Sequence, residues 1–481
     1  MRTGQTPMNT IANSHPPVSE SPATARREKR FDWPVCYETE RLLLGHLEAF
    51  LARNRFARQL TERMRTETGT LLFDWIDYLV VPEREESALR KAGFIEDPLG
   101  ETGGSELALH HPEAMLPRVL IAPRNADAPA TIAIHPESLC DFMAAHGLSG
   151  EPEGEPLSRF RRLLVSQDKG TRFEAVERHG YRGFVAAKPR TGQAEAFLKA
   201  RELWHTRTRV FSEDTDGYWS AHATLDRIIG MVARDLACHV VFDGERAYWQ
   251  RRNRAAQFQK QRQDRLGLGW GNHDHHTFRS SREHFLDLMR VMEKLGFERR
   301  ERYYAGAQAG WGAQILEQPV EGIVVFADVD LLPEETEIDF SRAPLPPTPR
   351  LGTIGLWVGL HGESFLEAGM HHLEARFDFA LVREQLKELS INGMPPFSDF
   401  EFLKQAFTDG ERWPVRRERA GKLLRGGLIT EAQFQKFVSE GAIGSHLETL
   451  QRRGGFKGFN QKSVSAIIAA TDPRTQSPSH A

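Results

Sequence analysis

What the chain lacks already narrows its class. Its 481 residues include only three cysteines and no Cys-x-x-Cys pair, which excludes a cysteine-based zinc site and is typical of a reducing compartment. Basic residues are not in excess, because 63 Lys and Arg stand against 66 Asp and Glu, and this argues against a nucleic-acid-binding protein. The sequence has no apolar run long enough to span a membrane and no apolar signal core at its start. We therefore expect a cytoplasmic protein whose partners include neither nucleic acid nor membrane.

The order of predicted elements indicates an α+β protein built from several modules, since the length suits about three units of about 150 residues. Composition shifts and linkers, including the Pro-rich stretch 344–349, suggest the boundaries. The stretch Glu245–Arg265 is rich in Arg and Lys, and we interpret it as a solvated helix face. We expect a disordered leader over 1–30, structural N-terminal modules over 31–200, a helical segment over 201–268, catalytic modules over 269–335 and 350–471, and a disordered tail over 472–481.

A strand, helix and three strands in succession form the clearest repeated pattern. After Gly271 the helix shows apolar residues at helical spacing, among them Phe285, Leu288 and Met292. The N-terminal half holds a similar run that begins with strand Trp75–Val81. The first catalytic unit is predicted as strand His273–Ser280, helix Arg282–Leu295, and strands Arg299–Tyr304, Gly312–Glu317 and Gly322–Asp328. The second is predicted as strand Gly369–Phe377, helix Ala380–Leu389, a helical excursion over 398–440, strand Ser445–Gln451 and helix Lys462–Ala470.

Histidines gather at the start of the first catalytic unit, in the stretch Gly271–Arg279. Because side chains alternate along a strand, His273, His275 and Arg279 are predicted to share one face. Imidazoles beside a guanidinium suit a metal with a carboxylate-bearing substrate next to it. Strand alternation permits either His273 or His275 as the ligand.

Two further polar stretches repeat this theme. In Gly369–Arg376 the alternation places His372 and Arg376 on one face. In the last predicted strand, Glu448 lies within a β-patterned stretch, where a buried carboxylate must be paired or bound to metal. Two imidazoles and one carboxylate form the facial triad of non-haem Fe(II) oxygenases, which leaves open positions for substrate and O₂.

These stretches resemble the Fe(II)-dependent 2-oxo acid dioxygenases of the vicinal oxygen chelate superfamily, whose paired βαβββ modules form cupped mixed sheets. The metal-binding motifs of the 4-hydroxyphenylpyruvate dioxygenases are similar to Asp274-His275, His372 and the stretch Glu448–Arg452 of this chain. Two motifs also resemble those of the 2-oxoadipate dioxygenase/decarboxylase family. They are the His-x-x-x-Arg motif of His275 and Arg279 and the double-histidine motif that ends at Arg376.

The resemblance implies a function and a set of roles. His275, His372 and Glu448 would hold Fe(II), and the catalytic candidates are Arg279, Arg376 and Gln451. The substrate would be a small 2-oxo acid that reacts with O₂, with 2-oxoadipate giving 2-hydroxyglutarate as the favoured case. Phe456 and the last helix would close the site. The oligomeric state stays open.

Two alternatives remain at this point. The same scaffold could hold another metal and act as an isomerase, lyase or hydrolase, or it could bind a ligand without catalysis. Strict O₂ dependence separates the first alternative from a dioxygenase, and failure to bind any metal would favour the second. The Gly-Asn-His-Asp motif at 271–274 also occurs in metallophosphoesterases, but this sequence lacks the other motifs of that family.

Overall fold

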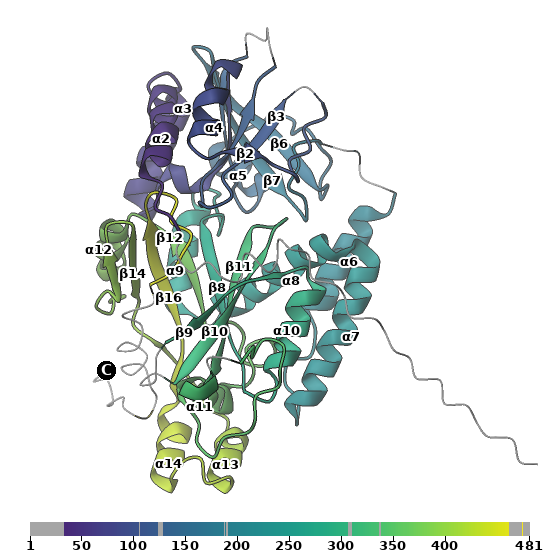
Figure 1. Cartoon of the computed structure of the whole chain (residues 1–481), viewed down its shortest axis with the longest axis vertical. Helices are drawn as coiled ribbons and strands as arrows, with labels where there is room; N and C mark the ends of the chain where they lie inside the picture. Colours follow the sequence, from purple (N-terminus) through teal and green to yellow (C-terminus); the bar gives the residue numbers. More distant parts are fainter. Residues whose placement is uncertain are drawn as a thin grey trace, which may run out of the picture.

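The computed structural model describes residues 33–460 and Arg474, apart from 105, 124–127, 187, 189–190, 306–309 and 336–337. The described chain folds into two mixed β-sheets, one in each half, with helices packed around them (Figure 1). None of the helices in these residues is both long enough and apolar enough to cross a membrane. The predicted helix Lys462–Ala470 lies outside the described residues.

The N-terminal half contains a seven-stranded sheet in the order β2-β3-β4-β1-β5-β7-β6. β1 is parallel to β4, and β5 is parallel to β7, so each of two units begins and ends on neighbouring parallel strands. Helix α4 follows β1 and α5 follows β5. The elements are β1 (Ile76–Val81), α4 (Glu86–Lys91), β2 (Ile95–Glu96), β3 (Leu107–His110), β4 (Arg118–Ile121), β5 (Ala130–Ile134), α5 (Leu139–His146), β6 (Phe160–Asp168) and β7 (Thr171–Arg178).

The C-terminal half contains a nine-stranded sheet in the order β13-β14-β16-β12-β8-β11-β10-β9, with β15 paired to β16. Its two units are joined where β8 and β12 run antiparallel. β8 is parallel to β11 and β12 to β16, which repeats the arrangement of the first sheet. The elements are β8 (His273–Arg279), α10 (Phe285–Lys294), β9 (Glu298–Tyr304), β10 (Trp311–Gln318), β11 (Ile323–Asp330), β12 (His372–Arg376), α12 (Phe379–Glu388), β13 (Ser398–Phe400), β14 (Leu403–Phe407), β15 (Glu411–Trp413) and β16 (Ala442–Arg452).

This topology confirms the predicted α+β class of repeated βαβββ modules with added helices. One segment differs from its prediction, because the first part of 398–440 is extended rather than helical. β13, β14 and β15 pair with one another or with β16, and this tertiary pairing overrides the local pattern. The added helices are α2 (Tyr37–Leu51), α3 (Arg55–Arg63), α6 (Gln193–His205), α7 (Asp214–Val232), α8 (Arg234–Gln250), α9 (Arg254–Asp264), α11 (Thr353–His361), α13 (Arg417–Arg425) and α14 (Glu431–Glu440), with short turns of helix at Met64–Thr68, Leu72–Trp75, Glu83–Glu85 and Pro333–Glu335.

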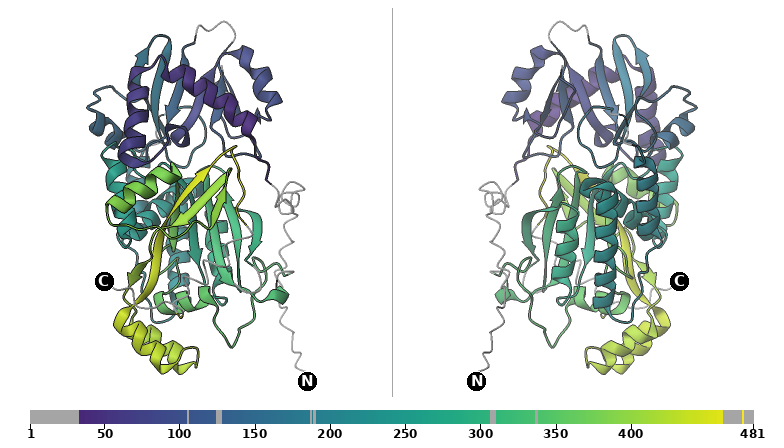
Figure 2. Two further views of the ribbon diagram at one scale, coloured as in Figure 1. Left: turned by 90° about the vertical axis from the view of Figure 1, so that its left-hand side faces the viewer. Right: turned by 90° about the vertical axis from the view of Figure 1, so that its right-hand side faces the viewer.

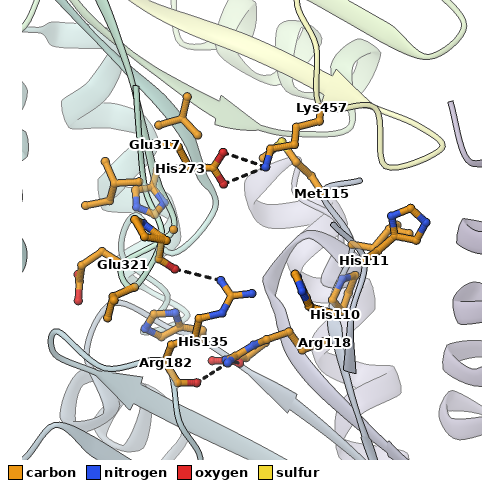
Figure 3. Close-up of a pocket in the computed structure, with 18 of the residues that line it drawn as sticks. His110, His111, Met115, Arg118, His135, Arg182, His273, Glu317, Glu321 and Lys457 are labelled. Carbon is orange, nitrogen blue, oxygen red and sulfur yellow. Dashed lines mark hydrogen bonds and ion pairs between the residues drawn. The ribbon is translucent and has the colours of Figure 1, made fainter. Parts of the chain in front are cut away.

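The two halves lie end to end and exchange backbone hydrogen bonds (Figure 2). The amide of Cys36 donates to the carbonyl of Gly454 at 2.7 Å. The amide of Glu137 donates to the carbonyl of Leu268 at 3.0 Å. Residues of both halves also line a cavity of about 440 Å³ (Figure 3).

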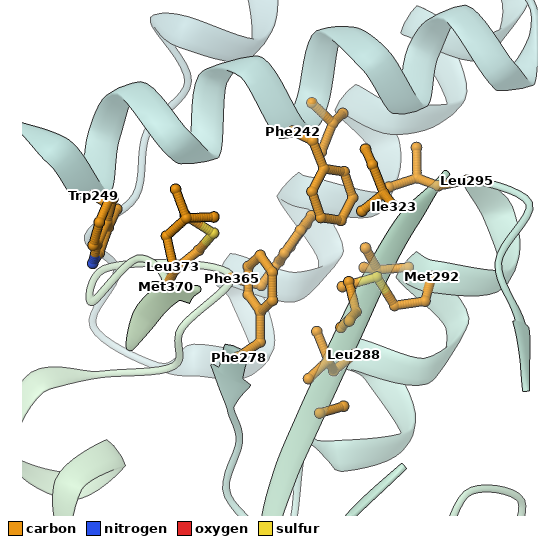
Figure 4. Close-up of a cluster of buried hydrophobic side chains, with 14 of the residues drawn as sticks. Phe242, Trp249, Phe278, Leu288, Met292, Leu295, Ile323, Phe365, Met370 and Leu373 are labelled. Atoms are coloured by element: carbon orange, nitrogen blue, oxygen red, sulfur yellow. The ribbon is translucent and has the colours of Figure 1, made fainter. Parts of the chain in front are cut away.

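The largest apolar core covers one face of the C-terminal sheet. Phe278 of β8 and Leu373 of β12 point into it and meet residues of α8 and α10 (Figure 4). Because neighbours in a strand alternate, His275 of β8 and His372 and Glu374 of β12 face the other way. Residues that share this core include Phe242, Leu288, Met292, Leu295, Ile323, Phe365 and Met370.

A buried ion cluster stabilises the N-terminal sheet at the place where β1 corresponds to β8. Arg118 and Arg178 both bind the carboxylate of Asp77, which is 4% exposed. Burial alone would raise the pKa of Asp77, but the two guanidinium groups hold it well below its usual range. The carboxylate of Asp77 is thus compensated within the protein.

We predict that Asp77→Asn lowers the free energy of unfolding by about 3–5 kcal/mol at pH 7, because it leaves two buried cations uncompensated. A depressed pKa contributes stability above the unfolded-state pKa of about 4 and loses it as pH falls. The difference from wild type should therefore narrow below about pH 4. Urea denaturation checks this, with the exposed Glu62→Gln as control. A difference under about 0.5 kcal/mol at pH 7 would contradict it.

Candidate metal centre

Three neighbouring strands bring imidazoles and carboxylates into adjacent rows. β12 lies between β8 and β16, and its Glu374 stands opposite both His275 and Glu448. In the next row, His372 stands opposite Thr277 on one side and His446 on the other. Residues far apart in sequence meet because the two units share a strand boundary at β8 and β12.

The ligand atoms of these residues converge. Nε2 of His372 lies 2.5 Å from Oε1 of Glu374 and 3.9 Å from Oε2 of Glu448. Nε2 of His275 lies 3.3 Å from the same Oε1 of Glu374. Neighbouring ligands of one metal ion are about 3 Å apart when each lies about 2.1 Å from it. The predicted ligands His275, His372 and Glu448 are therefore brought together, and Glu374 joins them.

The donor set suits a divalent cation. Within the described part of the chain, one group of His, Cys, Asp and Glu has ligand spacing, and its members His275, Glu374 and Glu448 are all buried. Oε2 of Glu374 has no hydrogen-bond partner. A buried polar atom without a partner is a place where an ion or an ordered water can bind. Imidazole and carboxylate together fit Fe(II), Mn²⁺ or Zn²⁺.

Burial sets the protonation of the cluster. It lowers the pKa of His275 to about 4, against the opposing effect of Asp274, and holds that of His372 well below 6.5. Both rings are thus neutral and able to ligate at pH 7. Burial raises the pKa of Glu374 and Glu448, and Glu448 adds to the shift of Glu374. A divalent cation would favour the ionised form of both carboxyls.

Asp274 positions His275. Its Oδ1 lies 2.9 Å from Nδ1 of His275, and both of its oxygens accept hydrogen bonds from Arg452 at 2.9 Å. Burial would raise the pKa of Asp274, but Arg452 and His275 hold it well below its usual range. The ionised carboxylate fixes the Nδ1–H tautomer, which leaves Nε2 free to bind metal.

A bulge separates His273 from His275. The register between β8 and β12 shifts at this point, so that His275 pairs with Glu374 but His273 pairs with Ala375. His273 packs against His276, whose ring contacts Phe242 on α8. The prediction that His273 and His275 share a face is wrong, because regular alternation fails at a bulge. The structure places His275 in the cluster.

Arg279 lies two rows from the ligands on the same face. It is buried, its Nε has no hydrogen-bond partner, and it lies 3.9 Å from Oδ2 of Asp328 on β11. Burial raises the pKa of Asp328 to about 7, against the effect of Arg279. Tyr303 follows in the same cross-strand row, and its hydroxyl has no partner. This row can bind the polar far end of a substrate.

The remaining predicted residues lie elsewhere. Arg376 lines the cavity between the halves, and its Nε lies 3.9 Å from Asp274. Gln451 accepts a hydrogen bond from the amide of Phe379 at the start of α12, so its side chain is not brought to the cluster. Phe459, rather than Phe456, contacts His275, with ring centroids 4.9 Å apart.

Sequence reasoning missed Glu374, Asp328 and Tyr303. Glu374 follows His372 by two residues, and this spacing alone could have placed it on the ligand face. Asp328 and Tyr303 had no such signal, because they reach the site only through cross-strand register.

Comparisons with known proteins complete this description. No family model matches the chain, and no curated protein matches it. A substituted 4-hydroxymandelate synthase from Streptomyces coelicolor is similar, with 12% identity, 84% of this chain and 99% of that chain covered, and a TM-score of 0.28. Methylmalonyl-CoA epimerase from Mycobacterium tuberculosis matches at 11% identity, over 38% of this chain and 88% of that chain, with a TM-score of 0.22. A xylose isomerase-like TIM barrel/4-hydroxyphenylpyruvate dioxygenase fusion protein matches at 11% identity, over 90% of this chain and 58% of that chain, with a TM-score of 0.23. The fold described above rests on strand order and register.

We predict that Asp274→Asn weakens divalent-metal binding by about 10–100-fold, because the amide no longer fixes the His275 tautomer. Equilibrium competition with a chromophoric chelator measures the affinity. Asp399→Asn, which removes an exposed carboxylate of the same sheet, should leave it unchanged. Equal affinities for Asp274→Asn and wild type would contradict a role for Asp274 at the metal.

Proposed function

We propose that the protein is an Fe(II)-dependent dioxygenase that acts on a small 2-oxo acid. The observation that carries this proposal is the buried convergence of His275, Glu374 and Glu448 on adjacent strands, with Nε2 of His372 3.9 Å from Oε2 of Glu448. In the proposed reaction, a 2-oxo acid and O₂ yield CO₂ and a hydroxy acid one carbon shorter. With 2-oxoadipate, the substrate we favour, the product is 2-hydroxyglutarate.

The iron would supply sites for the substrate's carboxylate and 2-oxo oxygens and for O₂. Arg279 holds the distal carboxylate through charge-assisted hydrogen bonds, and its burial strengthens this contact because water does not compete. Its Nε has no hydrogen-bond partner and lies 3.9 Å from Oδ2 of Asp328, so that it can donate to a substrate carboxylate. The Tyr303 hydroxyl can donate a further hydrogen bond to the same group.

Aromatic side chains keep water from the reacting end. Phe459 packs against Phe326 with ring centroids 4.3 Å apart, and both rings contact His275. Arg452 holds this loop through the carbonyls of Phe456 and Gly458. Exclusion of water protects reactive species from side reactions. Catalytic roles for Arg376 and Gln451 remain predictions.

Glu374 favours a second candidate function. Three protein ligands would leave three open positions on a six-coordinate metal. If Glu374 were a fourth ligand, two positions would remain, and a chelating 2-oxo acid would fill both and leave none for O₂. A carboxylate at this place could instead accept a proton from a carbon next to a metal-bound carbonyl. A metal-dependent isomerase or lyase that needs no O₂ is therefore the alternative.

We predict that the protein loaded with Fe(II) consumes O₂ with 2-oxoadipate, that His275→Ala abolishes this uptake, and that Glu374→Gln retains it. An oxygen electrode measures uptake, with 4-hydroxyphenylpyruvate and other 2-oxo acids tested in parallel. Turnover of a 2-oxo acid without O₂ consumption, lost in Glu374→Gln, would favour the isomerase or lyase.

We also predict that Arg279→Ala raises KM for the 2-oxo acid by more than about tenfold, since a charge-assisted hydrogen bond contributes about 1.5–3 kcal/mol. Steady-state kinetics give the value. Arg290→Ala, which removes an exposed guanidinium from α10, is the control. An unchanged KM in Arg279→Ala would remove Arg279 from substrate binding.

A further inference from the structure

The cavity between the two halves is separate from the metal cluster. It has a volume of about 440 Å³, within the range of small-molecule sites. His110, Arg118 and His135 line it from the N-terminal half, and His273 and Glu321 line it from the C-terminal half (Figure 3). His275, His372 and Glu448 are not part of its wall.

Most charged groups in this wall are paired within the protein. Lys457 lies 2.8 Å from Glu317, and Arg182 lies 3.0 Å from Asp97. Glu321 lies 3.0 Å from His239. In each pair the two charges compensate each other, so this part of the cavity does not require a charged ligand.

The end of the cavity near His273 differs. Arg246 of α8 is 8% exposed; its Nη1 lies 3.4 Å from Nε2 of His276, its Nε has no hydrogen-bond partner, and the carboxylate of Glu137 lies 3.8 Å from that Nε. Nε of Arg376 also has no hydrogen-bond partner; it lies 3.9 Å from Oδ2 of Asp274, and Nη1 lies 4.0 Å from Oδ1 of Asp74. A buried N–H group without an acceptor is costly.

These groups act on one place. Arg246 lies 3.4 Å from His276, whose ring packs against that of His273 with centroids 5.2 Å apart, and Arg376 directly follows Ala375, which pairs with His273. Nδ1 of His273 has no hydrogen-bond partner either. The three side chains come from α8, β12 and the start of β8 and line the same cavity. A carboxylate or phosphate between them would supply acceptors for both guanidinium groups, which bind such anions bidentately.

We propose that this end of the cavity is a second binding site, for a small carboxylate or phosphate anion held by Arg246, Arg376 and His273. Asp274 separates it from the metal centre, since this residue contacts His275 on one side and Arg376 on the other. The site does not depend on the proposed dioxygenase activity.

Calorimetric titration of the metal-loaded, full-length protein with inorganic phosphate, and separately with succinate, tests the proposal. We expect saturable binding of at least one anion, with the tighter one identifying the ligand class. Arg246→Gln and Arg376→Gln should each weaken it at least tenfold. Arg299→Gln, which removes a cavity-lining guanidinium paired with Glu293, and His372→Ala, which removes a metal ligand, should change it less than twofold.

Three outcomes would overturn the proposal. They are no saturable binding of either anion to wild type, unchanged affinity in both Arg246→Gln and Arg376→Gln, or loss of binding in His372→Ala, which would place the anion on the metal. Circular dichroism verifies that each variant is folded. If Arg246→Gln does not fold, Arg376→Gln decides the matter, because the Arg376 side chain is 22% exposed.

Discussion

Two carboxylates buried next to each other in the middle of a sheet are the constraint on which the C-terminal half depends. Glu374 and Glu448 stand opposite each other on β12 and β16, with His275 and His372 beside them. The hydrogen bonds from Thr277 to Glu374 and from Gln405 to Glu448 satisfy only part of their capacity. Such an arrangement is unfavourable without a cation and favourable around one. The cluster could therefore bind a divalent cation, which would favour the ionised form of both carboxyls.

The surrounding structure supports that arrangement from both sides of the sheet. On the apolar face, Phe278 and Leu373 fix β8 and β12 against the helices. On the polar face, Asp274 and Arg452 lock the ring of His275. The corresponding strand of the N-terminal half, β1, differs, because its Asp77 forms ion pairs with Arg118 and Arg178. Corresponding strands of the two halves therefore carry a compensated ion cluster in one half and a cluster with ligand spacing in the other.

Much of this could be predicted from the sequence, where local pattern decides. Helix α10 follows its hydrophobic periodicity, and the predicted strands of the C-terminal half all lie in one sheet. The bulge in β8 has no signal in the sequence, so strand alternation predicts the wrong face for His273. Asp328 and Tyr303 depend on cross-strand register, which sequence spacing does not encode. β13 and β14 form through pairing with β16, a long-range interaction that local propensity misses.

Anomalous diffraction at the iron absorption edge, from crystals grown with Fe(II) without oxygen, tests the central claim most directly. The account predicts one peak per chain, about 2.0–2.2 Å from Nε2 of His275, Nε2 of His372 and a carboxylate oxygen of Glu448. The distance from the same peak to Glu374 would show how many positions stay open for substrate and O₂. A metal-soaked crystal with these side chains ordered and no peak among them, or a peak only elsewhere, would contradict the account.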